Sequence, residues 1–260
     1  MLKLKKFNLF ASFVQGFRAP NLQESTVLGN TGSKFEVPNS DLRPEHSNTI
    51  EGGSKVHLGP VELSATAFYS MLKDAIDEVP AEFEGQSVRD DGSSVVKRVN
   101  TAEGLYWGIE SSAALKLWRL TLRTGATWMK GDLTHGDGTT TPARRVPPLF
   151  GTVSLRYTHP DKSAYLELYS RWAGAQDRLH PSDVKDLRIC ETSPYSGQLL
   201  ESCAGTPGYA VFGARAGWKF IKKMRADLSI HNLADTNYKI HGSGYPGPGL
   251  DARLTLSGRF

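Results

Sequence analysis

Apolar and polar side chains alternate with a period of two along most of this chain, and that alternation constrains its fold more than any other feature. It is clear over residues 250–260, where Leu254 and Leu256 fall on one side of an extended segment and Arg253 and Thr255 fall on the other. A period of two is the period of a β-strand. Chain ends are usually polar and unpaired, so an alternating segment that reaches a terminal aromatic residue indicates a structural strand.

Ten segments show this pattern, and the connections between them alternate in length. The predicted strands are residues 3–17, 46–58, 61–73, 97–116, 119–131, 148–158, 163–174, 208–220, 224–234 and 249–260. Short turns lie at 58–60, 118–119, 160–162 and 221–223, and long polar connections occupy 18–45, 74–96, 132–147, 175–207 and 235–248. Strict alternation of short and long connections is typical of an antiparallel up-and-down transmembrane β-barrel. The predicted fold class is therefore all-β.

The overall composition does not exclude such a barrel, although it resembles that of a soluble protein. Hydrophobic residues make up 39% of the chain and charged residues 22%. No segment approaches the roughly 18 apolar residues that a membrane-spanning helix needs, but a membrane barrel needs apolar residues on only one face of each strand. Periodicity alone does not decide which face is outward, so a soluble β-barrel with an apolar interior remains an alternative.

Charge and the first residues narrow the function classes. The formal net charge of +4 comes from dispersed basic residues that are not interleaved with stacking aromatics, so no nucleic-acid partner is expected. Near the start, lysines precede an apolar run, but Asn8 and Ser12 interrupt the run and no small-residue cleavage site follows. We therefore predict a strand there and not an export signal.

Aromatic residues lie at or near the short-turn ends of the predicted strands, where the interfacial girdle of a membrane barrel would place them. They are Trp118, Tyr157, Tyr165, Trp218, Phe220 and Phe260.

The two cysteines, Cys190 and Cys203, lie in one long polar connection. Their spacing suits a disulfide that closes a loop in an oxidising compartment, with two free thiols as the alternative. Two cysteines alone make a poor zinc site, and His135 and Asp137 have few other metal-binding residues around them. We therefore expect neither a metal nor another cofactor.

Short motifs lie at the strand ends in a fixed order along the chain. They comprise Phe17, Arg18, Ala19 and Pro20; then Asn39, Leu42, Pro44, Glu45 and Glu51; then Gly108, Glu110 and Pro147; and finally Asn232, Leu233, Asp235, Tyr238, Gly247 and Phe260. Taken together and in this order, the motifs resemble those of the TonB-dependent outer-membrane receptors, and the resemblance spans essentially the whole chain.

The resemblance implies a twenty-two-stranded barrel with an N-terminal plug that imports a scarce small-molecule metal chelate. A siderophore–iron complex is the main expectation, and cobalamin or another chelate is the alternative. Residues 1–260 would be one domain, the C-terminal ten strands, without the plug and the early strands. An open sheet of this kind would leave two unpaired edges in lipid, so it must pair with a further part or close on itself.

The resemblance also implies a location and partners. The location would be the cell outer membrane of a Gram-negative bacterium, with outer-membrane lipid around the barrel. Energy would come from the TonB–ExbB–ExbD system through the plug. The barrel-assembly machinery would recognise the last strand with its terminal Phe260.

Two sets of residues are candidates for functional roles. On the polar faces of the strands, where a barrel would turn them to the lumen, lie Glu51, Glu110, Glu167, Arg123, Arg156, Arg171, Arg215, Asp227 and Arg253. In the long connections, four residues are candidates for ligand contact by location only, namely His180, Tyr195, His241 and Tyr245. A haem receptor of this kind would be expected to carry a histidine between the first two motifs, and residues 21–44 contain none.

Three other functions are alternatives to that of a receptor. Ten strands is also the size of the omptin-like outer-membrane proteases, and Asp90, Asp91, His180 and Asp183 could imitate their acidic and Asp–His pairs. None of these residues lies in a recognisable catalytic context, so we predict that the chain is not an enzyme. A passive porin is a second alternative, and the soluble barrel is a third.

Overall fold

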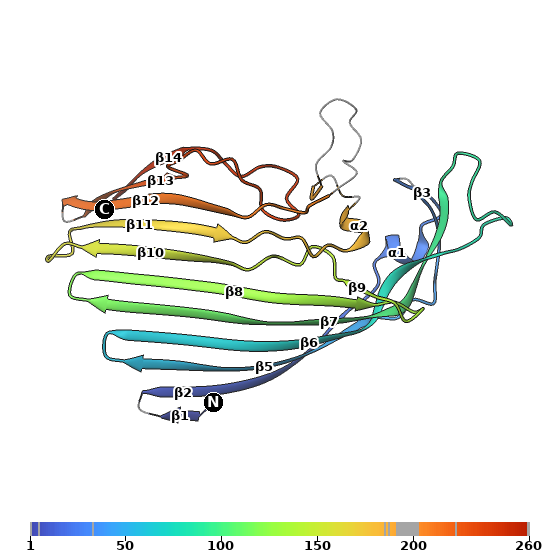
Figure 1. Ribbon diagram of the computed structural model, residues 1–260, viewed down its shortest axis with the longest axis horizontal. Helices are drawn as coiled ribbons and strands as arrows, with labels where there is room; N and C mark the ends of the chain where they lie inside the picture. Colours follow the sequence, from blue (N-terminus) through green and yellow to red (C-terminus); the bar gives the residue numbers. More distant parts are fainter. Residues whose placement is uncertain are drawn as a thin grey trace.

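The computed structural model describes residues 2–4, 6–32, 34–184, 186, 188–190, 203–221 and 223–258, so Tyr195 and Phe260 lie outside the described residues. One antiparallel sheet dominates the structure, and its main strands follow one another in chain order (Figure 1). In that order they are β1 (Leu2–Leu4), β2 (Phe7–Arg18), β5 (Glu45–Leu58), β6 (Val61–Pro80), β7 (Ser94–Leu117), β8 (Leu120–Thr134), β10 (Phe150–Thr158), β11 (Ala164–Ala173), β12 (Tyr209–Ile221), β13 (Met224–His231) and β14 (Asp251–Gly258). The predicted all-β antiparallel fold class is confirmed.

Three further strands and two short helices lie in the long connections. They are α1 (Leu22–Thr26), β3 (Gly29–Thr31), β4 (Lys34–Val37), β9 (Thr140–Pro142) and α2 (Pro181–Val184). β4 adds to the edge of β7 in parallel. In the part of the chain that the structure describes, neither helix is long and apolar enough to cross a membrane.

Each predicted strand has a counterpart, with two differences. The predicted strand at residues 3–17 is a hairpin, because the chain turns at Lys6 and β1 pairs with β2. β6 continues seven residues past its predicted end and β7 begins three residues before its predicted start, so ten of the 23 residues of the predicted connection 74–96 are strand. The hydrogen-bonded ladder between β6 and β7 continues through a register shift near Asp74. The φ of 55° at Asp74 marks a bulge that bends both strands.

The register separates the sheet into two faces, because directly paired residues share a face. Leu122, Leu155 and Leu168 lie side by side on what we call the apolar face. Arg156 and Glu167 lie on the opposite, charged face. The predicted polar-face residues, from Glu51 and Glu110 to Arg253, all fall on this charged face.

The aromatic prediction needs one correction. Tyr157 and Trp218 lie on the apolar face near short turns, as predicted. Tyr165 lies on the charged face, where the guanidinium carbon of Arg156 is 4.2 Å from its ring centre. Its side chain is therefore a platform for an arginine and does not belong to a girdle.

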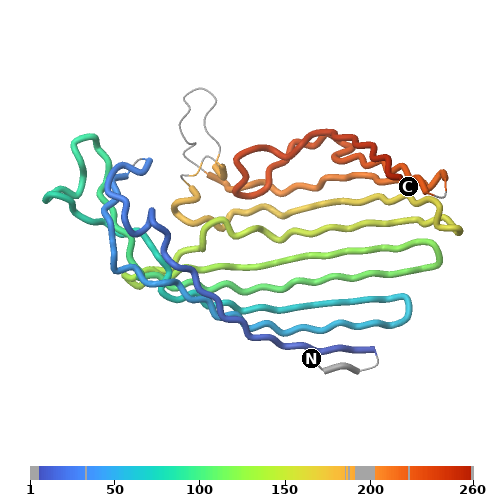
Figure 2. Tube along the Cα trace, turned by 180° about the vertical axis from the view of Figure 1, so that it is seen from behind, coloured from blue at the N-terminus to red at the C-terminus, as the bar shows by residue number. Residues whose placement is uncertain are grey.

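The long connections gather at one end of the sheet, which we call the rim (Figure 2). The largest fully buried side chains lie at this end, and they include Val95, Ile189, Val211 and Asn232. Past the rim, β6 and β7 bend away from the main sheet and carry β4 and β3 beside them (Figure 1). Within the described residues β14 pairs only with β13, so the main sheet is open here and most of its side chains are at least partly exposed.

Candidate functional site at the rim

Three long connections meet at the rim around the short helix α2. The carboxylate of Asp183 on this helix is almost completely buried, with 2% of its side chain exposed. It accepts a hydrogen bond of 3.0 Å from the backbone N–H of Arg145 and one of 3.3 Å from Nε of Arg144. A buried carboxylate requires such donors. Asp183 therefore ties α2 to the segment that leads into β10.

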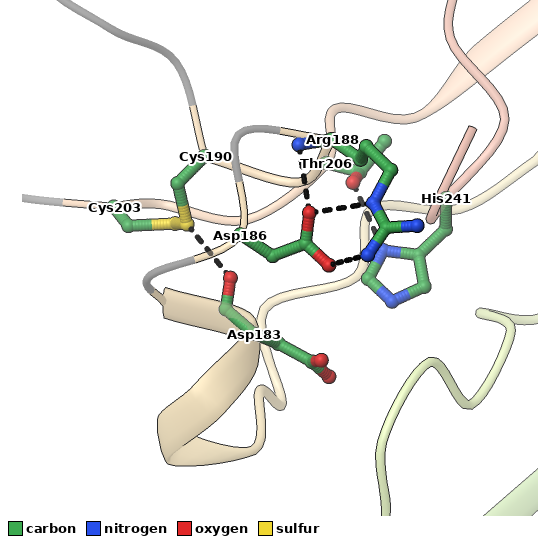
Figure 3. Close-up of a disulfide and its surroundings, with 7 residues drawn as sticks. All are labelled: Asp183, Asp186, Arg188, Cys190, Cys203, Thr206 and His241. Atoms are coloured by element: carbon green, nitrogen blue, oxygen red, sulfur yellow. Dashed lines mark hydrogen bonds and ion pairs between the residues drawn. A yellow bond between two sulfur atoms is a disulfide. The ribbon is translucent and has the colours of Figure 1, made fainter. Parts of the chain in front are cut away.

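A second buried carboxylate, Asp186, holds two arginines. It accepts from the backbone N–H of Arg188 at 3.0 Å, from Nε of Arg188 at 2.8 Å and from Nη2 of Arg188 at 2.7 Å (Figure 3). Nη2 of Arg145 donates to it at 3.0 Å. The hydrogen bonds from Arg188 are the main reason that the pKa of Asp186 lies well below its usual range.

The exposed charge of this cluster is positive. The side chains of Arg144, Arg145 and Arg188 are 49%, 40% and 46% exposed, whereas those of Asp183 and Asp186 are 2% and 8% exposed. A guanidinium offers five N–H donors, so each arginine that is held on one side by a carboxylate keeps donors on the other side. The cluster can therefore bind an anion without moving its arginines.

His180, one of the predicted ligand residues, is buried beside this cluster with 8% exposure. Its Nδ1 accepts a hydrogen bond of 2.9 Å from the backbone N–H of Ser182. Burial lowers the pKa of His180, which favours the neutral ring that this bond requires. Its ring centre is 6.2 Å from that of His135, which bridges Asp77 at 2.6 Å and Thr141 at 2.9 Å.

His241 belongs to the same cluster, on the connection that precedes β14. Its Nδ1 lies 2.9 Å from Oγ1 of Thr206, and burial lowers the pKa of its ring (Figure 3). The next residue, Gly242, lies against Arg145, since a Cβ at position 242 would be 3.5 Å from Cδ of Arg145. Tyr245 is on the same connection and is 82% exposed.

A disulfide joins Cys190 and Cys203, whose Cα atoms are 5.3 Å apart (Figure 3). The Sγ atom of Cys190 lies 3.4 Å from the backbone oxygen of Asp183. The crosslink thus fastens the segment after α2 next to the buried carboxylate.

The structure brings together two of the four predicted ligand residues, His180 and His241, and leaves Tyr245 exposed nearby. Sequence reasoning did not select Asp183 or Asp186 as partners of arginines. The sequence marks this cluster only by two adjacent arginines, Arg144 and Arg145, shortly before two prolines. Such a pair does not show which acidic residues bind the arginines. No group of three or more His, Cys, Asp and Glu in the described ranges could hold a metal ion.

Asn232 and Asp235 of the last sequence motif hold the connection between β13 and β14 in place through hydrogen bonds. The side chain of Asn232 is completely buried and donates to the backbone oxygens of Thr236 at 2.9 Å and Pro248 at 3.0 Å. Its Oδ1 accepts from the backbone N–H of Thr236 at 2.8 Å. Oδ1 of Asp235 accepts from the backbone N–H of Leu250 at 2.9 Å. These bonds fix the connection that carries His241 and Tyr245.

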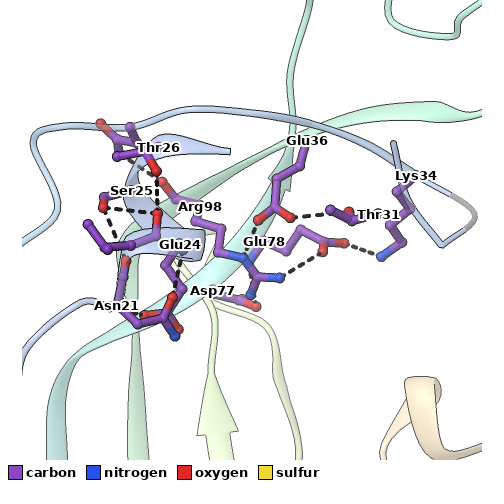
Figure 4. A network of polar contacts seen from close by, with 12 residues as sticks. Asn21, Glu24, Ser25, Thr26, Thr31, Lys34, Glu36, Asp77, Glu78 and Arg98 are labelled. Atoms are coloured by element: carbon purple, nitrogen blue, oxygen red, sulfur yellow. Dashed lines mark hydrogen bonds and ion pairs between the residues drawn. The ribbon is translucent and has the colours of Figure 1, made fainter. Parts of the chain in front are cut away.

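The first two motifs fasten the connection between β2 and β5. Arg18 donates to Glu45 at 2.6 Å and to Glu24 at 2.8 Å. Glu24 also closes a capping box with Asn21, the N-cap of α1 (Figure 4). The second oxygen of Glu45 accepts from the backbone N–H of Ile76 at 2.8 Å, which joins this connection to β6.

The bent part of β6 and β7 is fastened in the same way. The buried carboxylate of Glu36 pairs with Nε of Arg98 and accepts from Oγ1 of Thr31 at 3.2 Å (Figure 4). Lys34 of β4 pairs with Glu78 of β6. These contacts join carboxylates to groups of neighbouring strands, so their first role is to hold the shape of the rim.

The other motif residues have individual surroundings. Glu51 accepts a hydrogen bond of 3.1 Å from Ser12, and Asn39 donates one of 2.7 Å to the backbone oxygen of Arg98. Glu110 lines a groove of about 320 Å³ together with Ser64, Thr66 and Thr127. Gly108 leaves room for Phe68, since a Cβ at position 108 would lie 2.8 Å from that ring.

A family model, curated relatives and solved structures all match this chain, and they agree on its family or fold. The family described as TonB dependent receptor-like, beta-barrel matches residues 4–233. Among curated relatives, hemoglobin and hemoglobin-haptoglobin-binding protein A of Haemophilus influenzae is 24% identical over 90% of this chain and 22% of its own length. The catecholate siderophore receptor Fiu of Escherichia coli strain UTI89 is 22% identical over 97% of this chain and 31% of its own length. The chain thus spans less than a third of these relatives.

Solved structures agree in fold. A ferric enterobactin receptor of Pseudomonas aeruginosa superposes with a TM-score of 0.73 at 17% identity, over 99% of this chain and 38% of that one. The copper transporter OprC superposes with a TM-score of 0.72 at 16% identity, over 98% of this chain and 38% of that one. At these identities the likeness shows the fold alone.

Proposed function

This chain belongs to the TonB-dependent receptor family of β-barrels, and we propose that it forms part of the wall of an outer-membrane receptor for the active uptake of a scarce ligand. The family consists of receptors and transporters and not of proteases. Residues 1–260 would act as one barrel domain, and a plug and further strands from the rest of the receptor would complete it. The alternating connections and the division into an apolar and a charged face support this proposal.

The height of the apolar face is close to that of the hydrocarbon layer of a membrane. On β8 the apolar face is free of charged side chains from Leu120 to Trp128, and the next residue on that face is Lys130. Nine residues at about 3.3 Å each, tilted by about 45°, rise about 21 Å, which is close to the apolar band of about 25 Å of a transmembrane barrel. We infer that this face contacts outer-membrane lipid, that the charged face lines the lumen, and that the rim is extracellular.

The proposed partners follow from this placement. The energy-coupling system TonB–ExbB–ExbD would act through the plug. The barrel-assembly machinery would engage β14, where Leu254 and Leu256 present two of the most exposed apolar side chains of the sheet, at 67% and 66% exposure.

The proposed ligand is an iron–siderophore complex, with cobalamin or another chelate as the alternative. The observation that carries this choice is the rim cluster, in which three half-exposed arginines are held over two buried carboxylates. Ferric catecholate chelates are anionic, and fixed guanidinium groups suit anionic oxygens. Two of the similar proteins are named as receptors for a catecholate siderophore and for ferric enterobactin, which supports the same ligand class.

The test is uptake of an iron-55-labelled ferric catecholate by cells whose other receptors have been deleted and which express the complete gene product. Uptake should stop on addition of a protonophore. Replacement of Arg145 and Arg188 by Gln should weaken binding at least tenfold, because both lose their charge at the rim. Arg43→Gln is the matched control, since Arg43 is an exposed arginine, 68% exposed, that pairs with Asp74 elsewhere at the rim.

Other outcomes would favour the alternatives. Solute entry that ignores the protonophore would indicate a passive porin. Cleavage of peptides by the folded protein would indicate a protease. Binding that is equal in the rim variant and in wild type would contradict the assignment of the arginines to the ligand.

A further inference from the structure

The short turns, at the end of the sheet opposite the rim, are basic (Figure 1). Among the described residues of these turns, the basic ones are Lys6 between β1 and β2, Arg119 between β7 and β8, Lys162 between β10 and β11, and Lys223 between β12 and β13. The same turns contain one described carboxylate, that of Asp161, which lies 2.7 Å from Nδ1 of His159. The described part of this end therefore carries a net positive charge.

The strand ends next to the turns do not cancel this charge. The carboxylate of Glu62 is already paired with Lys116 at 2.7 Å, and that of Asp227 is paired with Arg225 at 2.5 Å. By contrast, Arg119, Lys162 and Lys223 have no carboxylate oxygen within 4.0 Å in the part of the chain that the structure describes. These three cations keep their hydrogen-bond donors for a partner outside the sheet.

The three turns that carry these cations are direct neighbours. The backbone N–H of Thr158, at the end of β10, donates 2.9 Å to the backbone oxygen of Arg119. The backbone N–H of Lys219 on β12 donates 2.7 Å to the backbone oxygen of Ser163. Neighbouring hairpins are two strand spacings apart, which is about 10 Å. The turns thus present one row of positive charge along the edge of the barrel wall.

Large apolar side chains are exposed next to the cations. Trp118 is 85% exposed, Trp218 59% and Ile221 57%. The guanidinium carbon of Arg119 lies 4.2 Å from the ring centre of Trp118. A guanidinium that stacks on an aromatic face keeps its edge donors free. Aromatic rings beside cations suit the boundary at which acyl chains meet phosphate groups.

The other end of the apolar face has mixed charges. Lys73 and Lys130 lie on this face near the rim, and the register places Glu103 and Asp132 on the same face at that end. The row of cations with few carboxylates is therefore a property of the short-turn end and not of both ends of the apolar face.

We propose that the short-turn end binds anionic phospholipids. Arg119, Lys162 and Lys223 contact the phosphates, and Trp118 and Trp218 contact the acyl chains beside them; together we call these five residues the basic collar. Guanidinium and ammonium groups donate to phosphate oxygens, and each basic residue near an anionic membrane surface strengthens binding about fivefold. The collar rests on the proposed function for its place at the periplasmic leaflet of the outer membrane.

The first test is native mass spectrometry of the complete gene product, folded in neutral detergent, with added lipid. Wild type should bind phosphatidylglycerol more tightly than zwitterionic phosphatidylcholine. The collar variant Arg119→Gln, Lys162→Gln, Lys223→Gln should bind phosphatidylglycerol more weakly than wild type by at least about tenfold. The charge-conserving variant Arg119→Lys, Lys162→Arg, Lys223→Arg should bind like wild type, which separates lost charge from misfolding.

A matched control removes three exposed cations from the other end of the wall. It is the variant Arg43→Gln, Lys73→Gln, Lys130→Gln. These residues lie near carboxylates, since Arg43 pairs with Asp74 and Lys130 is two residues from Asp132 on the same face. We expect this control to bind phosphatidylglycerol like wild type.

The second test locates the lipid in nanodiscs. Brominated phosphatidylglycerol should quench the tryptophan fluorescence of wild type more than brominated phosphatidylcholine at the same mole fraction. This excess should disappear in the double variant Trp118→Phe, Trp218→Phe. It should persist in Trp107→Phe, Trp128→Phe, which removes the two tryptophans of the apolar face near the rim.

Equal phosphatidylglycerol affinity in wild type and collar variant would overturn the basic collar. Excess quenching that survives the loss of Trp118 and Trp218 would also overturn it. If the collar binds phosphatidylglycerol but cells take up no ferric catecholate, the proposed function fails and the lipid site stands. If uptake is intact and the collar variant binds lipid like wild type, the collar alone fails.

Discussion

Tyr165 of β11 lies across Gly217 of β12, in the space that a side chain at position 217 would occupy. Its hydroxyl donates to Oδ1 of Asp227 on β13 at 3.1 Å, so the ring bridges three strands. A Cβ at position 217 would lie 2.5 Å from the same oxygen. The absence of a side chain at 217 is therefore what allows the tyrosine to lie flat on the wall.

We expect Gly217→Ala to destabilise the sheet by about 1–3 kcal/mol, because the added methyl group forces either Tyr165 or Asp227 to move. The measurement is urea unfolding in detergent, followed by tryptophan fluorescence. Gly52→Ala is the matched control, since it lies in β5 and a Cβ there would have no heavy atom within 4 Å. Equal destabilisation by both substitutions would show that strand propensity, and not the tyrosine, sets the cost.

The strands and their faces were predictable because they depend on local sequence. An alternating segment needs no knowledge of its partner, and cross-strand pairs such as Leu155 and Leu168 then share a face automatically. The pattern failed where alternation was ambiguous. Ala164 and Leu166 flank Tyr165, and sequence alone does not show that the ring turns to the charged face. The turn at Lys6 was missed because it lacks glycine and proline.

The rim cluster was less predictable because its contacts join residues that are far apart in the chain. Asp183 and Arg145 are 38 residues apart, and only the fold shows that they meet. His180 and His241 were selected for their location, yet their neighbours are buried acids that no local pattern marks. The final motif was predicted by resemblance alone. The structure shows why an asparagine occupies position 232, since its side chain makes three buried hydrogen bonds.

Asn232→Ala should loosen the connection between β13 and β14. The substitution removes a buried amide that makes three hydrogen bonds, and it places alanine at a φ of 55°, which favours asparagine or glycine. We expect a loss of about 1–3 kcal/mol, seen as faster proteolysis within residues 235–250. Asn237→Ala, at an exposed position on the same connection, should cleave at the wild-type rate. If Asn232→Ala were cleaved within residues 235–250 at the wild-type rate, Asn232 would not hold this connection in place.

Removal of the disulfide should destabilise the rim. Closing a loop of about 15 residues restricts the unfolded chain by about 3 kcal/mol, and the two cysteines are 13 residues apart. We therefore expect the double variant Cys190→Ser and Cys203→Ser to lose about 2–3 kcal/mol of unfolding free energy. Dithiothreitol should lower the stability of wild type to the same level and leave the double variant unchanged. A reductant effect of equal size in both proteins would exclude the crosslink as its cause.

Acid should weaken the rim through His180. Burial lowers the pKa of this ring in the folded protein, so protonation favours the unfolded chain. The stability that neutral His180 provides is complete above its ordinary pKa of about 6.5 and is lost as the pH falls below that value. Protonation of Nδ1 would also remove the bond from Ser182. We expect proteolysis around α2 to accelerate between pH 7 and pH 5. His180→Asn keeps an acceptor that does not titrate, so its cleavage rate should vary less with pH. An identical pH profile in wild type and His180→Asn would assign the effect to another group.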